Sequence, residues 1–114
     1  MDKRLIINAD DFGWDASATE GILDLAKKNA ISSTTVLATH VTASEIKDLI
    51  ALRNISVGYH LNLIDGNPVS RHSQVKSLTD KDGKFLSAQN IYKKFLLNTL
   101  SKAEIKTEIL NQIH

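Results

Sequence analysis

Hydrophobic and polar positions in the first half of the chain alternate between strand-like runs and helix-like stripes. Short apolar or β-branched runs predict strands over residues 4–9, 34–38 and 55–63. The segments 17–20 (SATE) and 42–45 (TASE) have the spacing of a capping box, and apolar residues recur at helical spacing after each. This strand–helix–strand–helix–strand order with short links predicts an α/β fold with a parallel sheet built from βαβ units.

The alternation of predicted strands and helices ends after the third predicted strand. Residues 65–68 (DGNP) have strong turn chemistry, and Asp82-Gly83 predicts the tip of a hairpin in the polar stretch that follows. Two more helices are predicted, over about 88–98 and from a cap at Ser101 onward. The last helix has no stop signal, and three parallel strands leave two edges unpaired. We therefore expect residues 1–114 to be the N-terminal part of one larger α/β domain.

Composition and charge exclude several classes of protein. The 114 residues carry 14 Lys and Arg against 13 Asp and Glu, so the net charge of +1 gives no reason to expect a nucleic-acid partner. Because the chain has no cysteine, it can form neither a disulfide nor a thiolate metal site. The apolar run near the N-terminus is too short for a signal sequence or a membrane span. We expect a cytoplasmic protein without a membrane partner.

The adjacent pair Asp10-Asp11 is the most informative polar feature. It is predicted at the carboxyl end of the first strand, where parallel α/β folds place their functional sites. Two neighbouring carboxylates repel each other unless a cation or a shared proton resolves the repulsion. The alternative is ordinary turn and cap chemistry, which also uses Asp before a loop.

The third predicted strand has two unlike faces, because side chains alternate along a strand. The apolar face suits packing against helices, and the other face combines a small residue, a His and an amide. The first face comprises Val57, Tyr59, Leu61 and Leu63, and the second comprises Gly58, His60 and Asn62. A lone His on a strand is often structural, but His60 is predicted at the same sheet edge as the acidic pair, which favours a ligand role.

Asp and His side chains together suit a divalent metal ion. Oxygen and imidazole ligands without thiolate fit Zn, Mn, Fe, Co or, less typically, Mg. A metal there would lower the pKa of a bound water from about 15.7 to about 7, and a neighbouring Asp could take its proton. This is a metal-assisted hydrolase in outline, although such sites usually have three protein ligands and the sequence offers two.

Three motifs carry a resemblance to a known family. The segments NADDFG (8–13), SSTT (32–35) and GYHLNL (58–63) resemble the YdjC-like family of carbohydrate deacetylases, and the likeness covers nearly the whole chain. The resemblance implies a (β/α) barrel related to polysaccharide deacetylases, of which this chain is the N-terminal βαβαβ part. It also implies a divalent metal ion, Mg or Zn, and removal of acetyl groups from N-acetylated, chitin-derived oligosaccharides.

The resemblance implies roles for the residues of this sequence that match the family's motifs. Asp11 and His60 match the family's metal-binding residues, and Asp10 matches the candidate general base that activates water. The family's third ligand is a His on the strand after the helix that ends this chain, and that segment is absent from the sequence. We therefore expect the 114-residue chain to be an inactive or weakly active fragment. A homodimer is expected from the resemblance alone.

The remaining candidate residues have two interpretations each. Trp14 could stack on a sugar ring or pack its loop onto the first helix. Asn62 and His72 are candidate substrate contacts, and for His72 a surface-loop role is the simpler alternative. His40 could line a pocket, but a loop or cap role is simpler still. His114 is interpreted as a terminal residue of the last helix and not as a ligand.

Two other classes of protein remain as alternatives. A phosphoacceptor receiver domain has this length and an acidic pair after its first strand, but its third strand should end in an Asp where this chain has His60. The second alternative is a non-catalytic protein that assembles with another copy through its unpaired strand edges.

Overall fold

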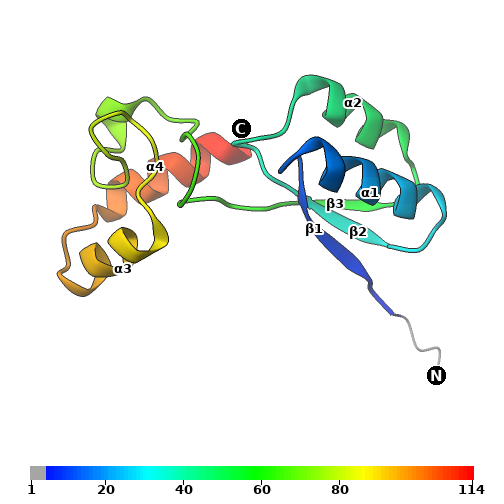
Figure 1. The fold of residues 1–114 in the computed structure, drawn as a ribbon, viewed down its shortest axis with the longest axis horizontal. Helices are drawn as coiled ribbons and strands as arrows, with labels where there is room; N and C mark the ends of the chain where they lie inside the picture. The colour runs from blue at the N-terminus through cyan, green and yellow to red at the C-terminus, as the bar shows by residue number, and fades with distance from the viewer. Residues whose placement is uncertain (1–4) are drawn as a thin grey trace. The chain divides into compact units, whose positions relative to one another are not determined.

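The computed structural model describes residues 5–114 and divides into two compact units, Met1–His60 and Leu61–His114. The first unit holds the sheet and two helices, and the second holds the remaining helices (Figure 1). No helix in the described part of the chain is both long and apolar enough to cross a membrane.

The first unit is a three-stranded parallel sheet with two helices. Strand order in the sheet is β1-β2-β3, and both neighbouring pairs are parallel, which confirms the predicted βαβαβ arrangement. The elements are β1 (Asn8–Phe12), α1 (Ala16–Lys27), β2 (Ser33–Val36), α2 (Ala43–Ala51) and β3 (Ser56–Tyr59).

All three strands differ from their predicted bounds, and the second, predicted over 34–38, runs over Ser33–Val36. The first strand, predicted over 4–9, runs over Asn8–Phe12 instead, and residue 4 lies outside the described residues. The apolar residues before Asn8 are exposed, whereas Phe12 is fully buried, so burial of Phe12 and not the apolar run decides where the strand lies. The acidic pair is consequently part of the strand. The third strand ends at Tyr59, four residues before the predicted end.

Both helices cover the same face of this sheet (Figure 1). Phe12 and Val36 point into the core on that face, where they pack with Ile22 of α1 and Leu49 of α2. Because side chains alternate, every other strand position faces away from the helices. We call this second surface the open face of the sheet.

One of the two predicted capping boxes in this unit is present. Thr42 caps α2, and the carboxylate of Glu45 accepts a hydrogen bond from the backbone N–H of Thr42. For α1 the prediction was wrong: the cap is Asp15, whose carboxylate accepts from the N–H of Ala18 at 2.8 Å. Asp is a strong cap, so α1 begins immediately after it and Ser17 falls inside the helix.

The apolar face of β3 is oriented as predicted but is not buried. Val57 and Tyr59 lie on the helix side and line an open groove with Ile46 and Ile50 of α2, yet they remain 54% and 58% exposed. The reason is that β3 is an edge strand with α2 covering only one flank, so these side chains lack neighbours on the other.

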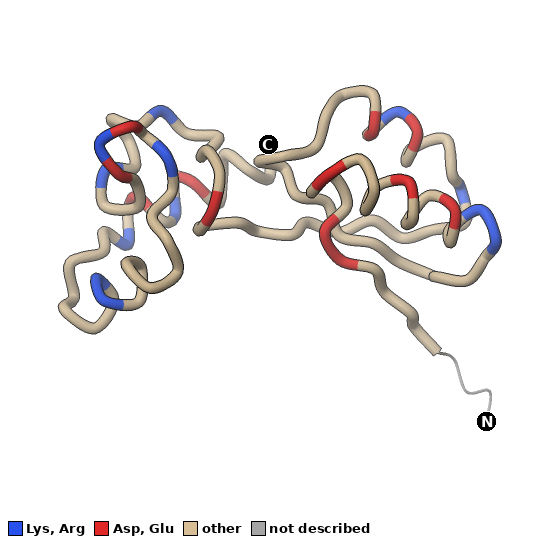
Figure 2. The backbone as a smooth tube through the Cα atoms, in the orientation of Figure 1, with Lys and Arg blue, Asp and Glu red and all other residues tan. Residues whose placement is uncertain are grey.

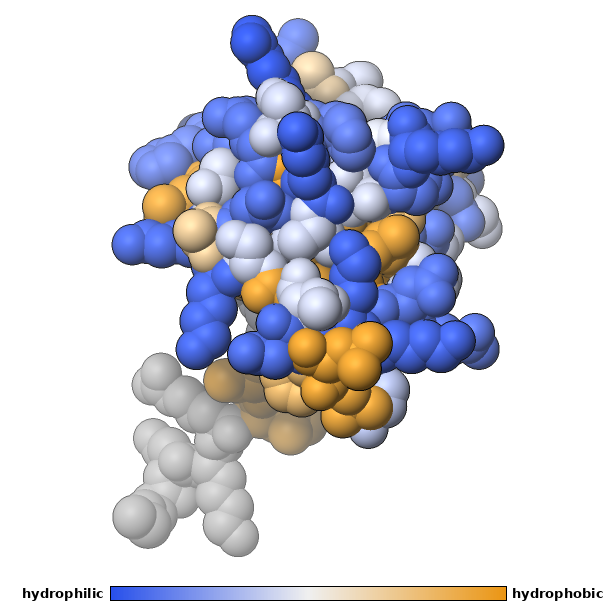
Figure 3. Space-filling view, turned by 90° about the vertical axis from the view of Figure 1, so that its left-hand side faces the viewer, coloured by the Kyte–Doolittle hydropathy of each residue, from blue (hydrophilic) through white to orange (hydrophobic). Residues whose placement is uncertain are grey.

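The second unit contains a short 3-10 helix (His72–Gln74), α3 (Ala88–Leu96) and α4 (Lys102–Ile113). The helix predicted over 88–98 thus ends two residues early. The predicted hairpin around Asp82-Gly83 is present as a single antiparallel bridge between Thr79 and Phe85. The side of this unit drawn in Figure 3 is mostly hydrophilic, with separate exposed apolar patches.

A buried carboxylate organises the second unit. Glu108 of α4 is fully buried and accepts hydrogen bonds from the N–H groups of Val69 and Ser70, each at 3.0 Å, and from Gln112 at 2.7 Å. Gln112 in turn pairs with both backbone groups of Asn62. Burial by itself would raise the pKa of Glu108, but these hydrogen bonds outweigh it and lower the pKa.

Candidate functional site

The open face of the sheet carries polar side chains in matched positions on neighbouring strands. On β1, Asn8 lies beside Ser33 of β2, and two residues further Asp10 lies beside Thr35. Thr35 is in turn paired with Gly58 of β3. Because Gly58 has no side chain, it leaves the surface beside Thr35 open.

A bulge lets both acidic residues contribute to this face. The register between β1 and β2 shifts between Ala9 and Phe12, which places one extra residue in β1. Asp11 takes up the extra position with a φ of 68°, a left-handed conformation that Asp tolerates better than most residues. In a regular strand, two adjacent side chains would point to opposite faces. The bulge therefore brings the adjacent residues Asp10 and Asp11 to the same face, which the alternation of side chains in the sequence did not predict.

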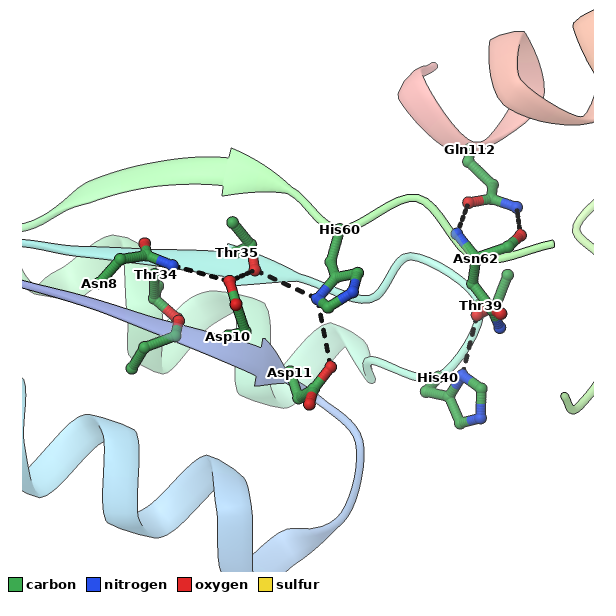
Figure 4. A network of polar contacts seen from close by, with 11 residues as sticks. Asn8, Asp10, Asp11, Thr34, Thr35, Thr39, His40, His60, Asn62 and Gln112 are labelled. Atoms are coloured by element: carbon green, nitrogen blue, oxygen red, sulfur yellow. Dashed lines mark hydrogen bonds and ion pairs between the residues drawn. The ribbon is translucent and has the colours of Figure 1, made fainter. Parts of the chain in front are cut away.

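Four side chains meet at this point (Figure 4). The hydroxyl of Thr35 donates to Asp10 Oδ1 at 2.8 Å. Nδ1 of His60 lies 3.3 Å from Thr35 Oγ1 and 3.1 Å from Asp11 Oδ1. The structure thus brings together Asp10, Asp11 and His60, the three residues predicted to carry catalysis and metal binding, and adds Thr35 to them.

The surroundings of Asp10 favour its ionised form. The Thr35 hydrogen bond is the main reason that the pKa of Asp10 lies below its ordinary value, and it outweighs a smaller effect of desolvation in the opposite direction. The Asn8 side chain and the nearby His60 lower the pKa further. Asp10 is consequently a carboxylate at neutral pH and can accept a proton. Figure 2 marks the acidic positions at the end of β1.

Asp11 and His60 lie within ion-pair distance, and carboxylate and imidazole are side chains of the types that bind divalent metal ions. Two atoms that each lie about 2.1 Å from one divalent ion are about 3.0–3.4 Å apart when the angle between them is about 90–110°. The 3.1 Å between Asp11 Oδ1 and His60 Nδ1 falls in that interval, and it is also the distance of a direct ion pair between the two side chains. Among the described residues, no group of three or more His, Asp or Glu side chains that could hold a metal ion comes together.

Trp14 lies in the loop after β1 and stacks on His40 from the loop after β2. The ring centroids are 5.1 Å apart with the planes at 18°, and Trp14 remains 46% exposed. The two loops are in close contact next to the rings, because a Cβ added to Gly13 would lie 2.6 Å from Cβ of Val41. Trp14 is thus an exposed aromatic surface held in place by a neighbouring loop.

The other two predicted substrate residues belong to the second unit. Asn62 is buried, and its side chain donates to the carbonyl of Asp65 and accepts from the N–H of Ile64. Nδ1 of His72, an exposed residue, lies 2.7 Å from the hydroxyl of Thr79. Both side chains have structural partners within their unit, and a substrate role for either stays a prediction.

Sequence reasoning missed Asn8 and Thr35 as members of the site. Both belong to the motifs that carry the family resemblance, but neither had been given a role. The available signal was period-two spacing: Asn8 precedes Asp10 by two residues, as Ser33 precedes Thr35. Side chains two apart on a strand share a face, so parallel pairing of these segments would have predicted the contact.

Comparisons with known proteins identify the family to which the chain is similar. A family model described as YdjC-like protein matches residues 4–114. A carbohydrate deacetylase from Listeria welshimeri is 34% identical over 96% of this chain, and one from Danio rerio is 29% identical over 97% of it. The chain spans 44% and 36% of the lengths of these two relatives.

A solved structure shows the same fold. A protein from Enterococcus faecalis V583, described as a candidate cellobiose-phosphate cleavage protein, superimposes with a TM-score of 0.83 at 29% identity. The match covers 99% of this chain and 43% of that one. The described architecture therefore corresponds to less than half of that protein's chain.

Proposed function

Because the chain belongs to the YdjC-like protein family, we propose that it carries the general base and two metal ligands of a carbohydrate deacetylase. The proposed reaction is the hydrolysis of acetyl groups from N-acetylated, chitin-derived oligosaccharides. The observation that carries the proposal is the placement of Asp10 beside the Asp11–His60 pair on the open face. The names of the relatives, carbohydrate deacetylases, support the removal of acetyl groups from a carbohydrate.

Each residue has a separate task in this proposal. Asp11 and His60 would hold a divalent ion, Mg or Zn, which when bound supplies Lewis-acid polarisation of the acetamide carbonyl and acidifies a water molecule. Asp10, ionised at neutral pH, accepts the proton of the attacking water and can return it to the departing amine. The products are acetate and a free amino sugar.

The substrate contacts are part of the same proposal. The exposed ring of Trp14 offers an apolar surface on which a pyranose ring can stack, close in sequence to Asp11. Asn62 and His72 stay candidates for further contacts to the oligosaccharide. The family membership gives no support to the receiver-domain alternative.

Asp11→Asn is the sharpest test of the metal-binding role. Asn tolerates the positive φ of 68° at this position, so the variant removes the charge with little backbone strain. We expect acetate release from N-acetylated chito-oligosaccharides to fall by about a hundredfold or more, because the variant replaces a charged ligand by a neutral one. Calorimetric titration with Zn²⁺ and Mg²⁺ should show weaker binding in the same variant. His60→Gln should behave alike in both measurements.

Asp65→Asn is the matched control, because Asp65 has a φ of 67° but belongs to the second unit. We expect it to keep both turnover and metal affinity. Full turnover in Asp11→Asn or in His60→Gln would refute the assignment of the site.

The assay uses the natural gene product, whose intact mass is measured first. We expect the 114-residue chain by itself to turn over slowly or not at all, because it offers two metal ligands where three are usual. Light scattering during size-exclusion chromatography tests the proposed homodimer, and also the alternative of a non-catalytic assembly protein.

A further inference from the structure

We propose that Asn8 and Thr35 are positioning residues that bind one oxygen of Asp10 and leave the other free to accept the proton. This inference rests on the proposed function, since it assigns a task to each oxygen of the general base. It concerns two residues on the open face of the sheet to which the sequence pattern assigns no role.

Both donors bind the same carboxylate oxygen. Asn8 Nδ2 lies 2.7 Å from Asp10 Oδ1, and Thr35 Oγ1 lies 2.8 Å from that same atom. Within residues 5–114, no side-chain or backbone donor binds Oδ2 of Asp10. A carboxylate oxygen with two donors has both of its in-plane lone pairs occupied. The proton of an attacking water therefore goes to Oδ2.

The orientation of Asn8 follows from the chemistry of its neighbours. An ionised carboxylate can only accept hydrogen bonds, so the NH₂ group of Asn8 must face Asp10. The amide oxygen then faces Ser33, whose hydroxyl donates to it at 2.7 Å. The result is a continuous chain of hydrogen bonds from Ser33 through Asn8 to Asp10.

These contacts are not needed to join the strands. β1 and β2 are already paired through their backbones, and on the helix side Thr34 donates from its hydroxyl to the carbonyl of Ala9 at 2.7 Å. Asn8 and Asp10 are exposed, so water could satisfy them if the network were absent. What the network adds is a fixed direction for the Asp10 carboxylate, and misplacement of a catalytic group by about 1 Å can cost about a hundredfold in rate.

The first measurement separates kcat from KM in a series of variants. Thr35→Val removes the hydroxyl and keeps the shape of the side chain, so we expect kcat to fall about ten- to hundredfold with KM within about threefold. Thr35→Ser restores the hydroxyl and should recover kcat to within about threefold. Asn8→Ala should lower kcat in the same direction. Thr34→Val is the control for loss of a neighbouring hydroxyl, and it should leave kcat within about twofold.

The second measurement needs no turnover and uses the 114-residue chain. In the ¹H–¹⁵N spectrum, the side-chain NH₂ signals of Asn8 should be displaced from those of a free amide and should move towards them in Asp10→Ala. Unchanged Asn8 signals in Asp10→Ala would overturn the proposal, and so would an unchanged kcat in Thr35→Val. If the wild-type enzyme releases no acetate at all, the proposed function fails, and the Asn8 signals still decide whether Asp10 is held in this way.

Discussion

Two carboxylates in this molecule show how differently the same group is used in its two units. Asp10 in the first unit is exposed, and only one of its oxygens accepts hydrogen bonds from the described residues. Glu108 in the second unit is fully buried, and both of its oxygens accept, from two backbone amides and one side chain. Burial makes an unpaired polar atom costly, so Glu108 is fully satisfied. Exposure lets water satisfy the second oxygen of Asp10, the oxygen that the proposed mechanism uses as the proton acceptor.

Both carboxyl groups have a lowered pKa, but the causes differ. At Asp10 the chief cause is the hydrogen bond from the hydroxyl of Thr35. At Glu108 burial acts in the opposite direction and is overcome by Ser70, Gln112 and Val69 together. Replacing each carboxylate by its amide therefore compares the exposed network around Asp10 with the buried network around Glu108.

The largest effect on stability is expected for Glu108→Gln. An amide has only one acceptor oxygen, so its NH₂ group would face the N–H of Val69 or Ser70, or the donor group of Gln112. We expect the second unit to lose about 2–3 kcal/mol of stability, the usual cost of unsatisfied buried donors. Hydrogen exchange at the Val69 and Ser70 amides measures this locally. Glu20→Gln, at an exposed position of α1, is the control and should leave that exchange unchanged.

A smaller effect is expected from acid. Because the folded-state pKa of Glu108 lies below its unfolded value, its contribution to stability is complete above the unfolded pKa and is lost as pH falls below about 4.3. Protection of the Val69 and Ser70 amides should decrease over that range. The decrease should be shallower in Glu108→Gln. Part of the decrease should remain in that variant, because the pKa of Glu104 is also lowered by its hydrogen bonds to Ser77 and protonation of Glu104 also destabilises the unit. An equally steep decrease in the variant would show that Glu108 does not contribute.

The smallest effect is expected for Asp10→Asn. The amide oxygen can still accept from Asn8 and Thr35, and the change removes the repulsion between two adjacent carboxylates. We expect the unfolding free energy of the first unit to change by less than about 0.5 kcal/mol. Urea denaturation followed by fluorescence measures this, because Trp14 is the single tryptophan of the chain and lies in that unit. A loss comparable to that of Glu108→Gln would remove the contrast between the two units.

Local chemistry determined much of the first unit. The alternation of strand-like and helix-like segments predicted the parallel βαβαβ order, and Thr42 with Glu45 predicted the start of α2. Period-two alternation also predicted that Val57 and Tyr59 share the helix side of β3. The helix start and the alternation along β3 depend on residues close together in the sequence, and the parallel order follows from the succession of such local segments.

What only the tertiary structure decided depends on pairing between distant segments. The register of β1 against β2 creates the bulge at Asp11, and this shift brings both acidic residues to the open face. Burial of Glu108 depends on a loop almost forty residues earlier in the chain. A sequence shows which side chains alternate within a strand, but register and burial follow from which segments pack together, and that is a property of the whole fold.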